Sequence, residues 1–169
     1  MRKVILFIAT SLDGYIANKD GSVDWLFTDQ DYGASAFMKT IDTILMGSKT
    51  FDKARQYGFS YFKGKKIYVF TKSKKNKATD GVEIINEDAV SFTQKLIRKK
   101  GKNIWLMGGG EFASSLQKKN LIDEYMLFVH PVIIGEGIPL FSNLAGISKL
   151  KLKSYKKFSS GLVGINYSK

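Results

Sequence analysis

The chain has 169 residues, about the size of one domain, and its 44% hydrophobic and 25% charged composition is that of a globular protein. Cysteine is absent, which excludes disulfides, thiolate metal sites and a cysteine nucleophile, and no apolar run is long enough for a membrane helix. The net charge of +12 comes almost entirely from dispersed lysines, which favours a solvated basic surface over a nucleic-acid site, although attraction of an anionic ligand remains an alternative.

Short branched-apolar runs alternate with amphipathic segments along most of the chain. In chain order we expect strands at residues 4–9, 43–46, 66–70, 82–85 and 103–107, with helices at about 32–39, 49–55, 88–99 and 111–119. The last third predicts strands at 124–134, 150–158 and 162–167, the last two joined by a hairpin at 159–161. This order predicts one domain over residues 1–169, of α/β class, with a mixed, mostly parallel sheet and an antiparallel C-terminal edge.

A turn signal follows the first expected strand directly, in the sequence Ser-Leu-Asp-Gly-Tyr-Ile-Ala at residues 11–17. A turn at Asp13 and Gly14 would fold Tyr15 and Ile16 over the carboxyl edge of the sheet, as a cover for a flat ring. Trp25, a little further on, offers a stacking face, although a core tryptophan is the alternative.

The strand at 43–46 ends in Gly47 and leads straight into a helix through Ser48, Lys49 and Thr50. Such a junction directs unpaired backbone N–H groups at whatever lies above the strand end, and a phosphate there also gains from the helix dipole. The spacing is not that of a P-loop, and a capped structural helix is the alternative.

A second junction of the same design follows the strand at 103–107, where three glycines at 108–110 precede a helix. Glycines in that number favour close approach of a ligand to the backbone. Two such junctions at one sheet edge could each take a phosphate of one dinucleotide, although the spacing is not a Rossmann fingerprint.

These motifs occur in an order that resembles the dihydrofolate-reductase-like family, in particular the branch similar to the C-terminal reductase domain of bifunctional riboflavin-biosynthesis enzymes. They are residues 11–17, Met-Gly-Ser-Lys-Thr-Phe at 46–51, Val-Phe-Thr at 69–71, Trp-Leu-Met-Gly-Gly-Gly-Glu-Phe at 105–112, 121–125 and Pro-Val-Ile-Ile-Gly-Glu-Gly at 131–137. The resemblance implies a three-layer dihydrofolate-reductase-like fold with NADPH across the carboxyl edge of the sheet. It also implies a homodimer, and the absence of cysteine fits a reducing compartment such as the cytoplasm.

Carried onto this chain, the resemblance implies that the nicotinamide is lined by Ala9, Gly14, Tyr15 and Ile16. The phosphates would be held by Gly47, Ser48, Lys49 and Thr50 and by Met107, Gly108, Gly109, Gly110, Glu111 and Phe112. The adenosine with its 2′-phosphate would contact Thr71, Lys72 and Ser73. Ser48 stands where dihydrofolate reductases usually have arginine, so the charge for NADPH would come from Lys49 or Lys72. Met107 stands where riboflavin reductases commonly have an acidic residue, which counts against the riboflavin substrate specifically.

A carboxyl group near the substrate nitrogen would help hydride transfer to a C=N bond, and the resemblance places an acid at the start of the helix after the loop. Asp29 and Asp31 are both available for that catalytic role, and Asp31 is preferred for its distance from the Gly47 junction; capping of the helix is the alternative interpretation. His130 is the only histidine, and without partners it is more often structural; no metal-binding cluster is evident. The expected substrate contacts are Asp13, Trp25, Asp29, Phe37, His130 and Glu136.

The leading hypothesis is therefore an NADPH-dependent reductase acting on a C=N group of a small pterin-like or ribosylaminopyrimidine-like substrate. One alternative is a basic nucleic-acid-binding module, which no recognition helix or arginine-aromatic platform supports. Another is a nucleotide-binding family member without turnover.

Overall fold

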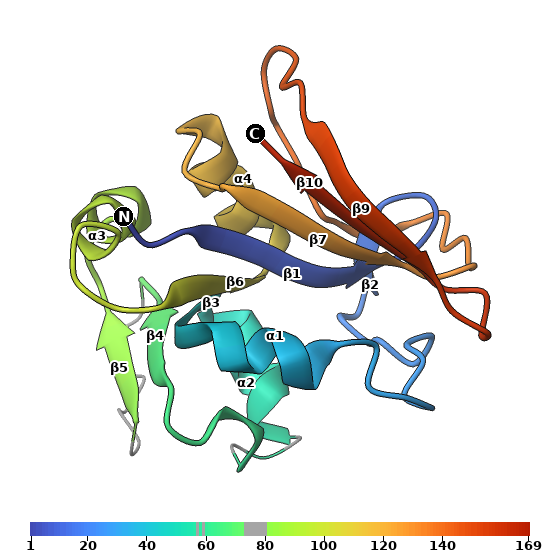
Figure 1. Ribbon diagram of the computed structural model, residues 1–169, viewed down its shortest axis with the longest axis horizontal. Coiled ribbons are helices and arrows are strands. Elements are labelled where there is room, and N and C mark those ends of the chain that lie inside the picture. Colours follow the sequence, from blue (N-terminus) through green and yellow to red (C-terminus); the bar gives the residue numbers. More distant parts are fainter. Residues whose placement is uncertain (57, 59, 73–80) are drawn as a thin grey trace.

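The computed structural model describes residues 1–56, 58, 60–72 and 81–169. Within these residues most strands belong to one sheet: β1 (Val4–Thr10), β3 (Ile41–Gly47), β4 (Lys66–Phe70), β5 (Val82–Ile85), β6 (Asn103–Gly108), β7 (Glu124–Val129), β9 (Lys151–Lys157) and β10 (Val163–Ser168). Their order across the sheet is β5-β4-β3-β6-β1-β7-β10-β9 (Figure 1). A separate two-stranded sheet pairs β2 (Tyr15–Asn18) with β8 (Gly137–Pro139).

The first six strands of the sheet order, from β5 to β7, are parallel. Strand β10 runs antiparallel to β7, and β9 runs antiparallel to β10. The α/β class and the mixed sheet with an antiparallel C-terminal edge, both predicted from the sequence, are confirmed. The hairpin is also confirmed, since Gly161 donates its N–H to the carbonyl of Phe158 at 3.1 Å.

Helices cover both faces of the sheet, which gives three layers (Figure 1). One face packs against α3 (Ala89–Leu96) and α4 (Gly110–Lys118), and the other against α1 (Ala34–Thr40), α2 (Ser48–Gln56) and the short 3-10 helix η1 (Ser60–Phe62). The two-residue period of β1 sends Val4 and Leu6 to the first face, and Ile5 and Phe7 to the second. Because both faces are buried, the parallel strands are apolar at almost every position.

Some element boundaries differ from the sequence prediction. Helix α1 begins at Ala34 rather than residue 32, because Tyr32 and Gly33 have φ values of 51° and 88° and so cannot belong to a right-handed helix. The strand expected over 124–134 ends at Val129, and β8 follows within the segment expected to be loop. The lysine-rich edge strand β9 is exposed along its whole length, which protects an open sheet edge from unwanted pairing.

Candidate active site at the carboxyl edge of the sheet

The two glycine-ended junctions lie side by side, as the sequence predicted. Strands β3 and β6 are neighbours in the sheet, and Met46, the residue before Gly47, pairs with Gly108. Helix α2 begins at Ser48 and helix α4 at Gly110, immediately after their strands. Both helix N-termini therefore meet at the same place on the carboxyl edge of the sheet.

The first turns of these two helices leave room for a ligand. A Cβ added at Gly47 would meet no atom within 4 Å, and one added at Gly109 would meet only the Oγ1 of Thr50, at an ordinary 3.5 Å. Gly109 is the N-cap residue of α4, and no side chain caps that helix. The first-turn N–H groups of two adjacent helices favour an anion such as a pyrophosphate.

The three consecutive glycines do not all serve the same purpose. Gly108 has a φ of 124°, which only glycine adopts readily, and its peptide bond to Gly109 is cis. A Cβ on Gly110 would lie 2.2 Å from the carbonyl oxygen of Pro139, so strand β8 itself occupies that space. The absence of a side chain at Gly110 therefore makes room for strand β8, and contact of the Gly110 backbone with a cofactor stays a prediction.

The other predicted cofactor residues lie around this edge. Lys49 is exposed in the first turn of α2 and Glu111 in the first turn of α4, with Ser48 half-buried. Thr71 and Lys72 follow β4, the strand that pairs with β3 up to Gly47, whereas Ser73 lies outside the described residues. The sidechains of Met107 and Phe112 turn into the two cores instead, with Phe112 4.8 Å from the ring of Phe70.

The segment after β1 folds back over the sheet edge as expected. Gly14 has a φ of 84°, and the amide of Tyr15 donates to Ser11 Oγ at 2.9 Å, which closes the turn. Leu140 donates its N–H to the carbonyl of Gly14 at 2.9 Å, and Ile16 packs against the core. Strand β2 is thereby fixed beside β8 rather than left as a loose loop.

Asp13, predicted to contact substrate, holds a neighbouring loop. Its carboxylate accepts the backbone N–H groups of Gly135 at 2.7 Å and Ile134 at 3.2 Å. Hydrogen bonds from Ser11 and from these two amides lower the pKa of Asp13. Glu136 in the same loop is exposed and forms an ion pair with Lys19.

A cavity of about 380 Å³, open to solvent, lies over the ends of β1 and β7. It brings together three residues that the sequence singled out separately, Ala9, Asp31 and His130. We call it the first cavity. Its remaining lining is Phe7, Leu26, Phe27, Thr28, Gln30, Tyr32, Ala34, Tyr61, Phe128 and Leu162.

Sequence reasoning missed most of that lining. Phe7 and Phe128 lie near the carboxyl ends of neighbouring strands, 4.6 Å apart between ring centroids. Phe7 has the same parity as Ala9 along β1, so the alternation of the strand places both on one face. That parity is the signal that could have identified Phe7. Phe37, expected to contact substrate, is buried and stacks on Phe7, with 4.2 Å between the ring centroids.

Asp31 lines the first cavity and also holds the start of α1. Its carboxylate accepts the backbone N–H of Ser35 at 3.0 Å and the Ser35 hydroxyl at 2.7 Å. These hydrogen bonds, that of the hydroxyl first, lower the pKa of Asp31. The side chain is therefore ionised at neutral pH, and in the free protein it is a hydrogen-bond acceptor and not a proton donor.

His130 is only 2% exposed and ties the segment at residues 25–27 to the sheet. Its Nδ1 lies 3.0 Å from the carbonyl oxygen of Phe128 and so carries the proton, and its Nε2 accepts the N–H of Phe27 at 3.2 Å. Burial lowers the pKa of His130, which keeps the ring neutral. Trp25 packs edge-on against it at 5.1 Å, so its ring supports the cavity wall.

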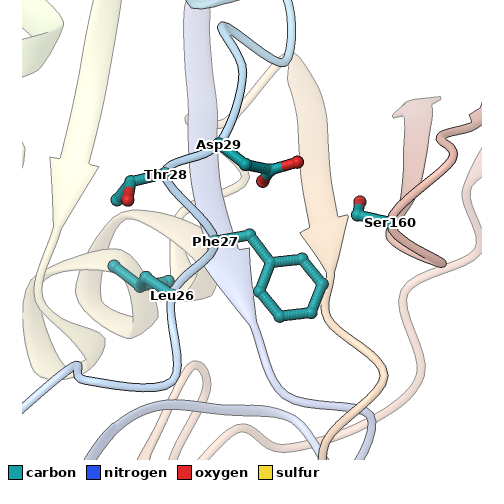
Figure 2. A pocket seen from close by; sticks show the side chains of 5 residues that line it. All are labelled: Leu26, Phe27, Thr28, Asp29 and Ser160. Carbon is teal, nitrogen blue, oxygen red and sulfur yellow. The ribbon is translucent and has the colours of Figure 1, made fainter.

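A second cavity, of about 460 Å³, shares Leu26, Phe27 and Thr28 with the first and adds Asp29 and Ser160. Figure 2 shows the Asp29 carboxylate directed toward Ser160, with the Phe27 ring below. Asp29 accepts a hydrogen bond from the Tyr32 hydroxyl at 2.6 Å, and that oxygen lies 2.8 Å from Ser160 Oγ. The hydrogen bond from Tyr32 lowers the pKa of Asp29.

The described residues contain no group of three histidine, cysteine or acidic side chains placed to hold a metal ion. No helix in the same part of the chain has both the length and the apolar character needed to cross a bilayer.

Comparison with known proteins places this geometry in a family. The sequence model of the RibD C-terminal domain family matches residues 2–59 and 52–164. YwjB of Bacillus subtilis, an uncharacterised protein, is 41% identical over 165 residues, which cover 95% of either chain.

Two solved structures share the fold. A Shewanella sp. PV-4 protein ascribed to riboflavin biosynthesis superimposes with a TM-score of 0.86 at 29% identity and covers 98% of both chains. The Thermotoga maritima diaminohydroxyphosphoribosylaminopyrimidine deaminase/5-amino-6-(5-phosphoribosylamino)uracil reductase gives a TM-score of 0.76 at 19% identity. This chain corresponds to 56% of that larger protein.

Proposed function

The chain belongs to the RibD C-terminal domain family, and from this membership we propose that it is an NADPH-dependent reductase. Its substrate is a small nitrogen heterocycle of the pterin or aminopyrimidine kind, reduced at a C=N bond. The pairing of Met46 with Gly108 carries the proposal, because it brings two helix N-termini together beside the first cavity. The proposal includes residues 1–169 acting as one domain and as a homodimer.

The residues at the sheet edge fit a dinucleotide. The open positions at Gly47 and Gly109 let its phosphates approach the backbone, where the first-turn N–H groups of α2 and α4 bind them. Lys49 and Lys72, both exposed, supply positive charge for the 2′-phosphate. When bound, NADPH supplies the hydride.

The first cavity fits the reacting rings. The small side chain of Ala9 allows a flat ring to lie on the end of β1, against the aromatic wall that Phe7 and Phe128 form together. The segment at residues 26–32 limits access of water from the other side. A heterocycle held there presents its N–H groups to the Asp31 carboxylate, which accepts them and favours a protonated, more electrophilic C=N bond.

Titration of the protein with NADPH, followed by tryptophan fluorescence, tests the proposal. Between ring centroids, Trp105 lies 5.8 Å from Phe7 and Trp25 lies 5.1 Å from His130. Each indole therefore contacts a residue of the first cavity. We expect a saturable change, and then loss of NADPH absorbance when pterins or ribosylaminopyrimidines are added. No binding at millimolar NADPH contradicts the proposal, whereas binding without oxidation across that panel favours a nucleotide-binding protein without turnover.

A further inference from the structure

The second cavity continues the first on the side of the C-terminal hairpin. Both cavities are lined by Leu26, Phe27 and Thr28, and the second reaches Ser160 in the turn between β9 and β10 (Figure 2). A heterocycle in the first cavity would therefore place a substituent of its ring in the second. The chemistry of the second cavity then determines which substituents fit.

The charges around the two cavities are negative. Among the described lining residues the charged side chains are Asp29 and Asp31, and there is no lysine or arginine. The hydroxyls of Tyr32 and Ser35, respectively, hold the pKa of each carboxyl group below its usual value. His130 adds no positive charge, since burial keeps its ring neutral. This anionic lining contrasts with the net charge of +12 of the whole chain.

The groups that normally bind a phosphate are engaged elsewhere. The N–H of Ser35 in the first turn of α1 donates to the carboxylate of Asp31, and that of Ala34 donates to its backbone carbonyl. Lys156, on β9, holds its ammonium 4.8 Å from the ring of Phe158 and does not line either cavity. A phosphate in the second cavity would meet the Asp29 carboxylate without a compensating cation from the described lining.

We infer, on the basis of the proposed reductase function, that the second cavity binds a neutral, hydroxylated or amine-bearing substituent of the heterocycle and excludes a phosphate monoester. Asp29 and Ser160 offer a hydrogen-bond acceptor and a hydroxyl to such a group, and Phe27 offers an apolar wall. The substrate class thus differs from that named for the Thermotoga maritima reductase, which carries a phosphoribosyl group.

A pair of ligands that differ only in the phosphate tests this inference. We would measure the affinity of the protein loaded with NADP⁺, which cannot reduce the ligand, for 5-amino-6-ribosylaminouracil and for its 5′-phosphate by calorimetry. One like-charge pair at 4 Å in water changes affinity about fivefold, so we expect the unphosphorylated compound to bind roughly tenfold or more tightly. The Asp29→Asn variant keeps an acceptor for Tyr32 and removes the charge, so the ratio should fall by about fivefold.

Asp24→Asn is the matched control. Asp24 is exposed in the same loop, accepts a hydrogen bond from Asn18 at 2.9 Å, and does not line either cavity. Its substitution should leave the ratio of affinities nearly unchanged. Equal or tighter binding of the phosphate ester, or equal effects of the two variants, overturns the inference and leaves the reductase proposal intact. NADPH binding with no binding of either compound contradicts both the inference and the ribosylaminopyrimidine substrate.

Discussion

A Cβ atom added to Gly109 would lie 3.5 Å from Thr50 Oγ1, so the first turns of α4 and α2 are in contact across the sheet edge. Residues almost sixty positions apart in the sequence thus form one surface of backbone N–H groups. The parallel pairing of β3 with β6 produces this contact, because it aligns the ends of both strands. The proposed phosphate site depends on that alignment more than on any single side chain.

Adding a negative charge at Gly47 should weaken cofactor binding without unfolding the protein. A side chain there enters open space, and Gly47 is not among the glycines with positive φ, so Gly47→Asp should change the free energy of unfolding by less than about 0.5 kcal/mol. Repulsion of the cofactor phosphates should raise the dissociation constant of NADPH roughly tenfold or more. Fluorescence titration and urea denaturation measure the two quantities. Gln56→Glu, at the opposite end of α2, is the control, and an equal loss of affinity there would count against a local phosphate site.

Neighbouring glycines should respond differently to the same substitution. Gly110→Ala places a Cβ 2.2 Å from the carbonyl oxygen of Pro139, which should destabilise the fold by about 1–3 kcal/mol. Gly109→Ala creates only an ordinary contact with Thr50, so stability should hold while its methyl group narrows the gap proposed for the pyrophosphate. Urea midpoints and NADPH titrations of both variants would show this. Unchanged NADPH affinity in Gly109→Ala would argue that the pyrophosphate lies elsewhere.

These glycines illustrate how far the sequence alone could lead. The alternation of strands with helices and the strand-glycine-helix pattern can be read locally, and they sufficed to predict the parallel sheet and the two adjoining junctions. The reason that residue 110 must be glycine is not local. Its neighbour Pro139 belongs to β8, a strand that the sequence did not indicate. A glycine that admits a ligand and one that admits the protein's own backbone have the same appearance in a sequence.

The first cavity shows the same limit. Ala9, Asp31 and His130 were each noted from the sequence, but only the fold brings them to one place. The neighbours of His130 come from residues 25–27 and from β7, and no spacing relates those segments. Its structural role depends on tertiary contacts that the sequence does not encode in any short pattern.

His130 should make the stability of the protein depend on pH below neutrality. Its pKa in the folded protein is lowered, so between 6.5 and that lower value the unfolded chain binds more protons than the folded one. Stability is therefore fully present above pH 6.5 and decreases as the pH falls through the folded pKa. Each unit of depression corresponds to about 1.4 kcal/mol. Urea denaturation between pH 7.5 and 5 measures the slope.

The chain has one histidine, so this slope has a clean control. His130→Gln removes the titrating ring, and the variant should be less stable at pH 7.5 yet nearly independent of pH down to about 5, where carboxyl groups begin to titrate. An unchanged slope in the variant would show that another group is responsible.

Two substitutions of Asp31 separate its contribution to the helix from its contribution to substrate. Asparagine still accepts the N–H of Ser35, so Asp31→Asn should retain the stability of α1, whereas Asp31→Ala should lose about 1 kcal/mol. If the ionised carboxylate binds the N–H groups of the heterocycle, both variants should lose roughly tenfold or more in kcat/KM, since hydrogen bonds to charged groups contribute about 1.5–3 kcal/mol. Urea denaturation and NADPH oxidation kinetics measure the two effects. Full activity in Asp31→Asn would mean that Asp31 only stabilises the helix, and the contacts to the substrate nitrogen would then have to come from other groups of the first cavity.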